Sequence, residues 1–138
     1  MLPKSPKEDI FYYLCVNCMR PEIKIKRVYD TPSKADGERI LVDRIWPRGL
    51  TKEKAKIKEW AKELAPSTEL RKWFHHEERL WGDFEKRYKA ELKKNNAVEA
   101  FRDAHRDKKV ITQVYAAKDE EHNQAIVLRE LLERLFGE

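Results

Sequence analysis

Apolar residues recur along the chain with two different periods, and each period predicts its own kind of element. The stretch 23–29 opens with alternating apolar and polar side chains, which predicts a strand with one face toward water. Residues 40–42 and 110–117 are mainly apolar runs with β-branched side chains, typical of strands buried on both faces. The pattern therefore predicts three short strands, two early in the chain and one late.

Helical periodicity begins directly after the second strand. Apolar side chains at i, i+3, i+4 and i+7 predict a helix between Thr51 and Pro66, with Ile57, Trp60, Ala61 and Leu64 on its buried face. Ser67 then predicts the N-cap of a second helix.

Three further helices are expected in the second half of the chain. One covers residues 80–92, and Asn95-Asn96 interrupts the pattern before a shorter one over 98–107. Asp119 is expected to cap a last helix that runs to Phe136. The residues expected to be largely buried are Trp60, Leu64, Trp73, Phe84, Val114, Leu128 and Leu132.

This order of elements predicts a single α/β domain over residues 23–138, with a small parallel or mixed sheet flanked by helices. Residues 1–22 begin with a polar stretch and are expected to be an N-terminal appendage. The connection over 31–39 is short for a parallel crossover, so an antiparallel hairpin is the alternative. We prefer a parallel pair joined by a single helical turn at 33–36.

Polar residues gather directly after each strand, in the segments 27–30, 43–49 and 118–123. Ligands of open parallel sheets bind beyond the carboxyl ends of the strands, and parallel strands would bring all three segments to one such edge. A hairpin would separate the first segment from the second, which is why we favour the parallel arrangement. The candidate site residues are Asp43 and His122 as proton carriers, and Arg27, Tyr29, Arg44, Trp46, Arg48, Lys118, Asp119 and Asn123 as ligand-binding residues.

Asp43 and Arg44 end a buried strand, where an unpaired carboxylate is costly. One interpretation is an internal Asp43–Arg44 ion pair that fixes the loop. The other is a carboxylate that moves a proton beside an anion gripped by Arg44 or Arg48. We expect Asp43, Arg44, Arg48, Lys118 and His122 to line one cleft.

Trp46 and His122 also have two interpretations each. Trp46 stands in a rigid Trp-Pro-Arg-Gly segment and either fills the core or offers a stacking surface to a base or sugar. His122 is either a general acid or base, or a structural hydrogen-bonding group. The sequence has no glycine-rich phosphate loop, no Gly-x-Ser-x-Gly elbow and no His-Glu-x-x-His motif, and we expect neither cofactor nor metal.

The formal net charge of +5 is mildly basic, and acidic and basic residues are interspersed. This mixture is typical of a solvated, ion-paired surface, whereas nucleic-acid binding favours a stripe of one sign. No apolar run approaches the roughly 18 residues of a membrane span, so we expect a cytoplasmic protein without a membrane partner. Whether it forms homo-oligomers is left open.

The two cysteines, Cys15 and Cys18, form a Cys-x-x-Cys motif near the N-terminus. A structural zinc site needs four ligands, and the chain has no second cysteine pair. Three interpretations stand side by side: incidental packing cysteines, a disulfide or redox pair, and a metal shared across a dimer.

Motifs at 25–30, 41–49, 63–67, 70–74, 115–119 and 122–123 follow one another in an order that resembles the YeaO-like family, a domain of unknown function numbered 488. The resemblance covers about residues 23–135 and implies a small α/β fold, with no established activity. Longer relatives carry Cys-His-Arg near His122-Asn123. This chain lacks that cysteine, so the resemblance implies no thiol nucleophile here.

The leading hypothesis is a protein that binds a small anionic, nucleotide- or phosphate-like ligand at the carboxyl ends of its strands, with hydrolase or transferase chemistry as an extension. The alternative is a nucleic-acid-associated accessory protein without catalysis, which would use its basic surface and Trp46 for stacking. A purely structural module is a third hypothesis, and the gathered ionisable groups argue against it.

Overall fold

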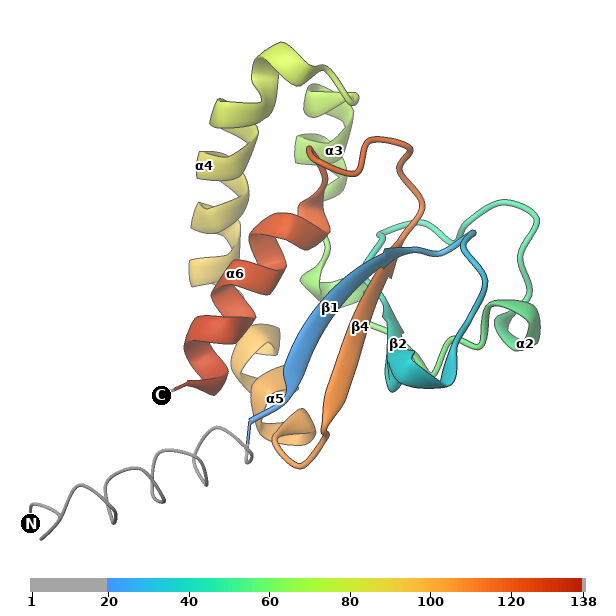
Figure 1. The fold of residues 1–138 in the computed structure, drawn as a ribbon. Coiled ribbons are helices and arrows are strands. Elements are labelled where there is room, and N and C mark those ends of the chain that lie inside the picture. Colours follow the sequence, from blue (N-terminus) through green and yellow to red (C-terminus); the bar gives the residue numbers. More distant parts are fainter. Residues whose placement is uncertain (1–19, 138) are drawn as a thin grey trace, which may run out of the picture.

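The computed structural model describes residues 20–137 (Figure 1). The strands of this part are β1 (Glu22–Arg27), β2 (Glu38–Leu41), β3 (Glu59–Trp60) and β4 (Val110–Tyr115). The α-helices are α2 (Lys52–Ala55), α3 (Thr68–Phe74), α4 (Trp81–Lys93), α5 (Asn96–His105) and α6 (Gln124–Phe136). Short 3₁₀ turns are η1 (Lys34–Asp36), η2 (Lys62–Leu64) and η3 (Glu78–Leu80). No helix in this part of the chain is long and apolar enough to cross a membrane.

The strands form one parallel sheet in the order β1-β4-β2-β3, which confirms the predicted α/β class. The parallel relation of β1 and β2 is also confirmed, although β4 lies between them. The connection contains the expected helical turn, because the Ser33 side chain caps η1 by accepting from the Ala35 N–H. The polar segments that follow β1, β2 and β4 therefore leave the sheet at the same edge.

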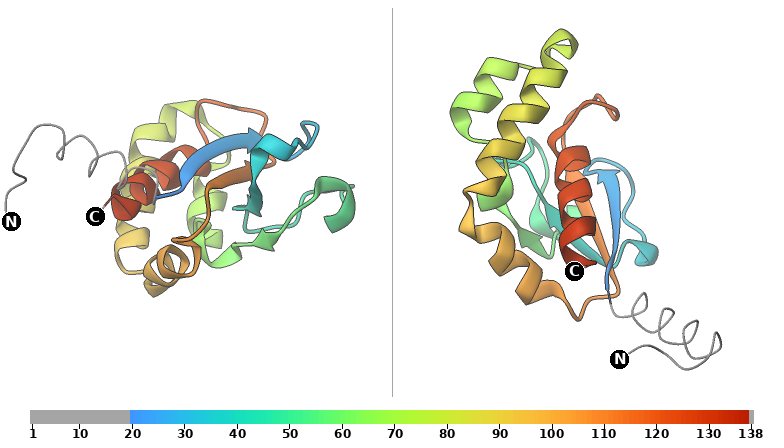
Figure 2. Two further views of the ribbon diagram at one scale, coloured as in Figure 1. Left: turned by 60° about the horizontal axis from the view of Figure 1, so that its bottom comes forward. Right: turned by 90° about the vertical axis from the view of Figure 1, so that its left-hand side faces the viewer.

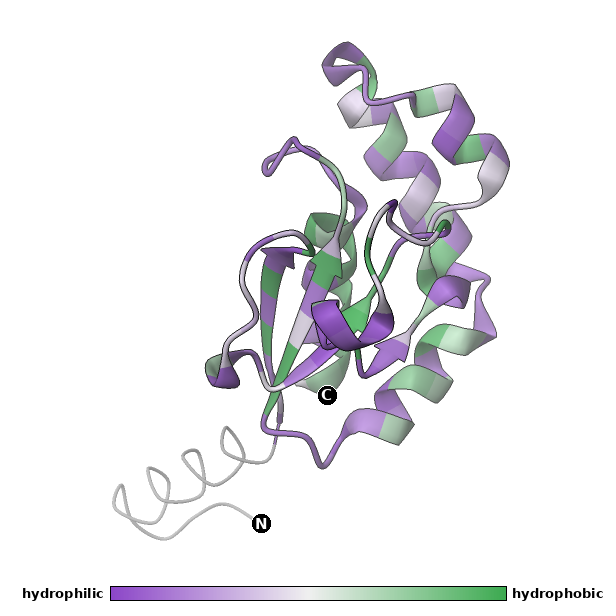
Figure 3. Ribbon diagram, turned by 90° about the vertical axis from the view of Figure 1, so that its right-hand side faces the viewer, coloured by the Kyte–Doolittle hydropathy of each residue, from purple (hydrophilic) through white to green (hydrophobic). Residues whose placement is uncertain are grey.

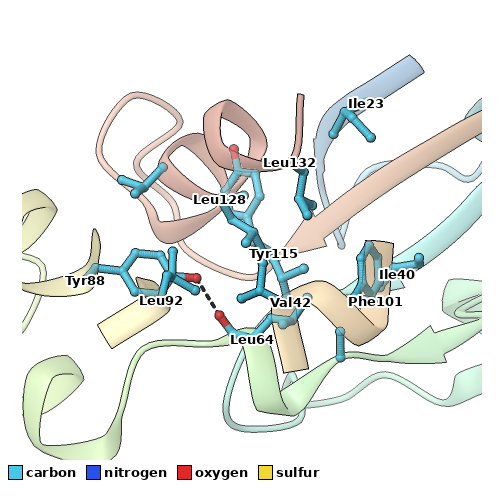
Figure 4. Close-up of a cluster of buried hydrophobic side chains, with 14 of the residues drawn as sticks. Ile23, Ile40, Val42, Leu64, Tyr88, Leu92, Phe101, Tyr115, Leu128 and Leu132 are labelled. Carbon is cyan, nitrogen blue, oxygen red and sulfur yellow. Dashed lines mark hydrogen bonds between the residues drawn. The ribbon is translucent and has the colours of Figure 1, made fainter. Parts of the chain in front are cut away.

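Helices cover one face of the sheet, and a loop with one helical turn covers the other. In Figures 1 and 2, α6 lies on β1 and β4, with α4 and α5 packed beside it and α3 packed against α4. Ile40 and Val42 point into this helical layer, where they join the main core cluster (Figure 4). Ile111 belongs to the same cluster. Leu41 and Val114 point to the opposite face and pack against the residues around α2, as the two-residue period of a strand requires.

The predicted helix between Thr51 and Pro66 is wrong. Thr51 caps only the single turn α2, which ends at Lys56 in the left-handed conformation, with φ 51°. Backbone pairing with β2 then takes over, because the Lys58 N–H donates to the Arg39 carbonyl and the Ala61 N–H to the Leu41 carbonyl. The apolar residues between Ile57 and Leu64 belong to the edge strand β3, the 3₁₀ turn η2 and the residues beside them rather than to a helix. The single turn α2 is mostly hydrophilic (Figure 3).

The other helices agree with the sequence expectations, with one correction. Ser67 caps α3, and α4 and α5 occupy the expected stretches on either side of Asn95. The N-cap of α6 is Asn123 rather than Asp119, because the Asn123 side chain accepts from the Ala125 N–H. Asp119 instead organises the turn that precedes the helix.

Most of the expected core residues are buried. Leu64, Phe84, Val114, Leu128 and Leu132 are each at most 2% exposed, and Trp73 is half-buried against the main cluster. Trp60 is 37% exposed, so its predicted burial is wrong. As part of an edge strand, it sits at the rim of the sheet, where its indole N–H donates to the Asp43 carbonyl.

Replacing Tyr88 with phenylalanine should lower the free energy of unfolding by about 1–3 kcal/mol. The Tyr88 hydroxyl is fully buried and donates to the Leu64 carbonyl at 2.6 Å (Figure 4), and phenylalanine leaves that carbonyl without its partner. Urea unfolding measures the loss. Tyr29→Phe is the matched control, because the Tyr29 hydroxyl bonds the Arg48 carbonyl at an exposed position. An equal loss in both variants would contradict the prediction.

Candidate functional site

A cavity of about 350 Å³ opens beyond the carboxyl ends of β2 and β4. Its walls come from the loop after β2, from α3 and from the turn that leads into α6. Of the candidate site residues, the lining includes Asp43, Arg44, Trp46, Arg48, His122 and Asn123. The lining does not include Arg27, Tyr29, Lys118 or Asp119, so the expected position of Lys118 in the cleft is wrong.

Asp43 stands at the floor of the cavity, two residues beyond the end of β2. One carboxylate oxygen accepts from the Ala116 N–H at 3.0 Å, and the other accepts from the side-chain amide of Gln124. Burial raises the pKa of Asp43 to about 6, although these two hydrogen bonds and the positive charge of Arg71 oppose the rise. The carboxyl group therefore changes charge close to neutral pH.

Arg44 does not pair with Asp43, so the internal ion pair inferred as one possibility from the sequence is not formed. Its guanidinium donates to the Pro66 carbonyl at 2.9 Å and to the Ala65 carbonyl at 3.0 Å. No ion pair within residues 20–137 joins it to Asp43. These bonds tie the loop after β2 to the turn before α3 and fix the arginine in the cavity wall.

Arg71 and Gln124 are cavity residues that the sequence reasoning missed. Arg71 lies on α3, and its Nε is buried without a hydrogen-bond partner among the described residues. Arg71 precedes the buried Phe74 by three residues, a spacing that predicts both side chains on the same, inner side of α3. Gln124 directly follows the cap residue Asn123 and bonds Asp43, a contact between distant segments that carries no local signal.

His122 and Asp119 form a hydrogen-bonded pair at the cavity mouth. Asp119 accepts from the backbone N–H groups of Glu121 and His122, and its other oxygen lies 2.9 Å from His122 Nδ1. The bond to Asp119 raises the pKa of His122, and the Glu121 N–H bond contributes most to lowering the pKa of Asp119. The opposite ring nitrogen of His122 lies 3.9 Å from Glu78, and the ring meets Trp81 edge-on.

The remaining sequence candidates support the cavity from outside or belong to its frame. Arg27 donates to the carbonyls of Ala116 and Ala117, and so holds the strand-to-helix turn. Trp46 lies in the lining, donates to the Leu50 carbonyl and meets Trp60 edge-on. Lys118 is exposed.

Residues 20–137 contain no group of three or more His, Cys, Asp or Glu side chains arranged to hold a metal ion. Cys15 and Cys18 lie outside the described residues, as does most of the expected N-terminal appendage.

The fold and the cavity define a small parallel α/β protein with a ligand-sized space at the carboxyl edge of its sheet. Residues 22–138 match the family described as "Inactive DUF488-N3 subclade", and the chain belongs to this family. This confirms the family resemblance of the sequence motifs.

Relatives of similar length support the assignment. The chain is 46% identical over 113 residues to "Uncharacterized protein YeaO" of Escherichia coli (strain K12), which covers 82% of this chain and 98% of that relative. It is 38% identical over 110 residues to "Uncharacterized protein Rv3073c" of Mycobacterium tuberculosis (strain ATCC 25618 / H37Rv), covering 80% of this chain and 92% of the relative. No solved structure matches it significantly.

Proposed function

We propose that the cavity binds a small anionic ligand of nucleotide- or phosphate-like chemistry. The observation that carries this proposal is Arg71, whose buried Nε has no hydrogen-bond partner among the described residues and whose side chain lines the cavity. A buried donor without a partner is costly, and an anion in the cavity would satisfy it. Arg44 and Arg48 line the same space and add positive charge.

The floor of the cavity adds a second requirement for the ligand. Asp43 lines the cavity, and when ionised its carboxylate can accept a further hydrogen bond from a ligand in addition to those from Ala116 and Gln124. A ligand that joins an anionic group to an N–H or O–H donor matches both features, as a nucleotide or a sugar phosphate does. Trp46 and Phe74 supply apolar wall for the rest of such a molecule.

We further propose that binding, rather than turnover, is the main activity. The matched family is described as an inactive subclade. Both oxygens of Asp43 already accept hydrogen bonds, and the outer nitrogen of His122 is turned toward Glu78. An acid–base hydrolase or transferase is the second candidate, because a pKa of about 6 suits Asp43 to proton transfer near neutral pH.

Calorimetric titration with inorganic phosphate and with nucleoside monophosphates tests the proposal. Arg71→Met should weaken binding about 10- to 100-fold, the size expected for the loss of a charged hydrogen bond. Arg79→Met is the matched control, because Arg79 is an exposed arginine paired with Glu77 and lies outside the cavity lining. Failure of every probe to bind, or equal weakening in both variants, would overturn the proposal.

Two further assays on the native chain and its variants test the catalytic hypothesis and the nucleic-acid hypothesis. Turnover of a bound nucleotide that falls at least 100-fold in Asp43→Asn, with binding retained, would establish acid–base chemistry instead. Tight binding of single-stranded DNA or RNA that weakens steeply with salt would favour the nucleic-acid role.

A further inference from the structure

A second hollow lies on the helical side of the molecule, away from the cavity. It is a groove of about 550 Å³ between α4, α5 and α6, and it shares no lining residue with the cavity. Its apolar lining includes Leu92, Val98, Val127 and Leu131. The right-hand view of Figure 2 faces this side, with α6 beside α4 and α5.

The described chain begins close to this groove. The Arg20 guanidinium lies against Gly137, at the end of α6, and the groove residues Arg134 and Leu135 belong to the last turn of that helix. An extended chain advances about 3.3 Å per residue, so the four steps from Arg20 back to Val16 reach about 13 Å. The residues just before Arg20 are therefore within reach of the groove.

The sequence of that stretch matches the chemistry of the groove. Residues 10–16 read Ile-Phe-Tyr-Tyr-Leu-Cys-Val, an uninterrupted apolar and aromatic run. Glu8 and Asp9 precede it, and the groove rim carries Lys89 and Lys93, for which no ion pair is found within residues 20–137. The groove lining also carries Arg134, Glu99 and Glu130, so its charge is mixed, and the two lysines of α4 are the part that suits the acidic end of the run.

We propose that the groove between α4, α5 and α6 is the docking site for residues 10–16 of the same chain. The family match begins at residue 22, so this stretch is an addition to the shared domain, and the groove residues all belong to that domain. In this arrangement the apolar residues 10–16 cover the groove, and Cys15 lies beside α6.

Cysteine crosslinking tests the docking directly, because both native cysteines lie in or beside this stretch. In a full-length Cys18→Ser background, Glu130→Cys introduces a thiol on α6 at the groove. A disulfide forms when two cysteine Cα atoms come within about 4.4–6.8 Å. Mild oxidation should therefore link Cys15 to the introduced thiol within one chain, giving a monomer that migrates faster on a non-reducing gel.

Glu53→Cys in the same background is the control, since Glu53 is an exposed residue of α2 on the opposite face of the sheet. Intramolecular linkage should be at least tenfold faster for Glu130→Cys than for Glu53→Cys. Adding Leu14→Glu, which places a charge in the apolar run, should remove that advantage. Equal rates at the two positions, or no effect of Leu14→Glu, would overturn the proposal. A disulfide-linked dimer as the main product would overturn it in favour of docking between two copies.

Discussion

Replacing Phe84 with alanine should lower the free energy of unfolding by about 3–5 kcal/mol, because it opens a large void inside the core. Phe84 is 2% exposed and lies where the core meets the cavity wall. Its ring stacks on Phe74 with centroids 4.4 Å apart and contacts the rings of Trp81 and Tyr88. These rings cannot fill the void without leaving their own contacts.

Trp60→Ala is the informative comparison, since it removes a larger side chain from a more exposed position. Trp60 is 37% exposed; it donates to the Asp43 carbonyl, meets the ring of Trp46 edge-on, and has the Lys62 ammonium 5.2 Å from its ring centroid. We expect a loss of about 1–2 kcal/mol, mostly from the hydrogen bond and the ring contact. Chemical denaturation of both variants measures the difference. A Trp60→Ala loss as large as that of Phe84→Ala would show that Trp60 belongs to the core.

Replacing Asp43 with asparagine should change the pH dependence of stability. The free energy of unfolding of the variant, minus that of the native chain, should be about 1–3 kcal/mol more favourable to the variant above pH 6 than at pH 4. The pKa of Asp43 is raised from 3.8 to about 6 in the folded state. The folded protein thus holds the proton more tightly than the unfolded chain, and this contributes stability below about pH 4. The contribution is lost as the pH rises through 6. Asparagine is neutral throughout and escapes that loss.

Urea unfolding of the native chain and the variant at several pH values between 4 and 7.5 measures this difference. Asp119→Asn is a control of opposite sign, because the pKa of Asp119 is lowered in the folded state. Its ionised form contributes stability at neutral pH that is lost as the pH falls, so Asp119→Asn should be the less stable protein at pH 7. A pH-independent difference between Asp43→Asn and the native chain would contradict the raised pKa.

Local patterns in the sequence predict most elements of the fold, because those elements depend on nearby residues. Ser33 and Ser67 cap the turns that their side chains can reach, and the buried runs around Ile40 and Val114 become the central strands. The stretch after Thr51 is the exception, because a parallel edge strand takes its hydrogen bonds from β2, on the far side of a turn and a loop. Apolar spacing alone does not distinguish that pairing from a helical stripe.

The location of the site could be predicted from the sequence, but the hydrogen-bond partners of its residues could be predicted only in part. Ligands of open parallel sheets bind beyond the carboxyl ends of the strands, and this rule correctly predicted that Asp43, Arg48 and His122 line one cavity. It could not assign partners, because the hydrogen bonds of Asp43 and Arg44 go to backbone groups and to Gln124 rather than to each other. Such bonds are fixed by the tertiary arrangement and leave no trace in spacing or composition.

The position of β4 in the middle of the sheet has a consequence for synthesis. β1 and β2 emerge early from the ribosome, yet β1 pairs only with β4 within the described sheet, and β2 has β4 as one of its two neighbours; β4 is made roughly 70 residues after β2. At typical translation speeds this delay is on the order of several seconds. During that time β1 has no strand partner, whereas β2 can already pair with β3 and α3, α4 and α5 can form locally. The sheet is therefore completed only when the last third of the chain has been made, because β4 is the strand that joins β1 to β2.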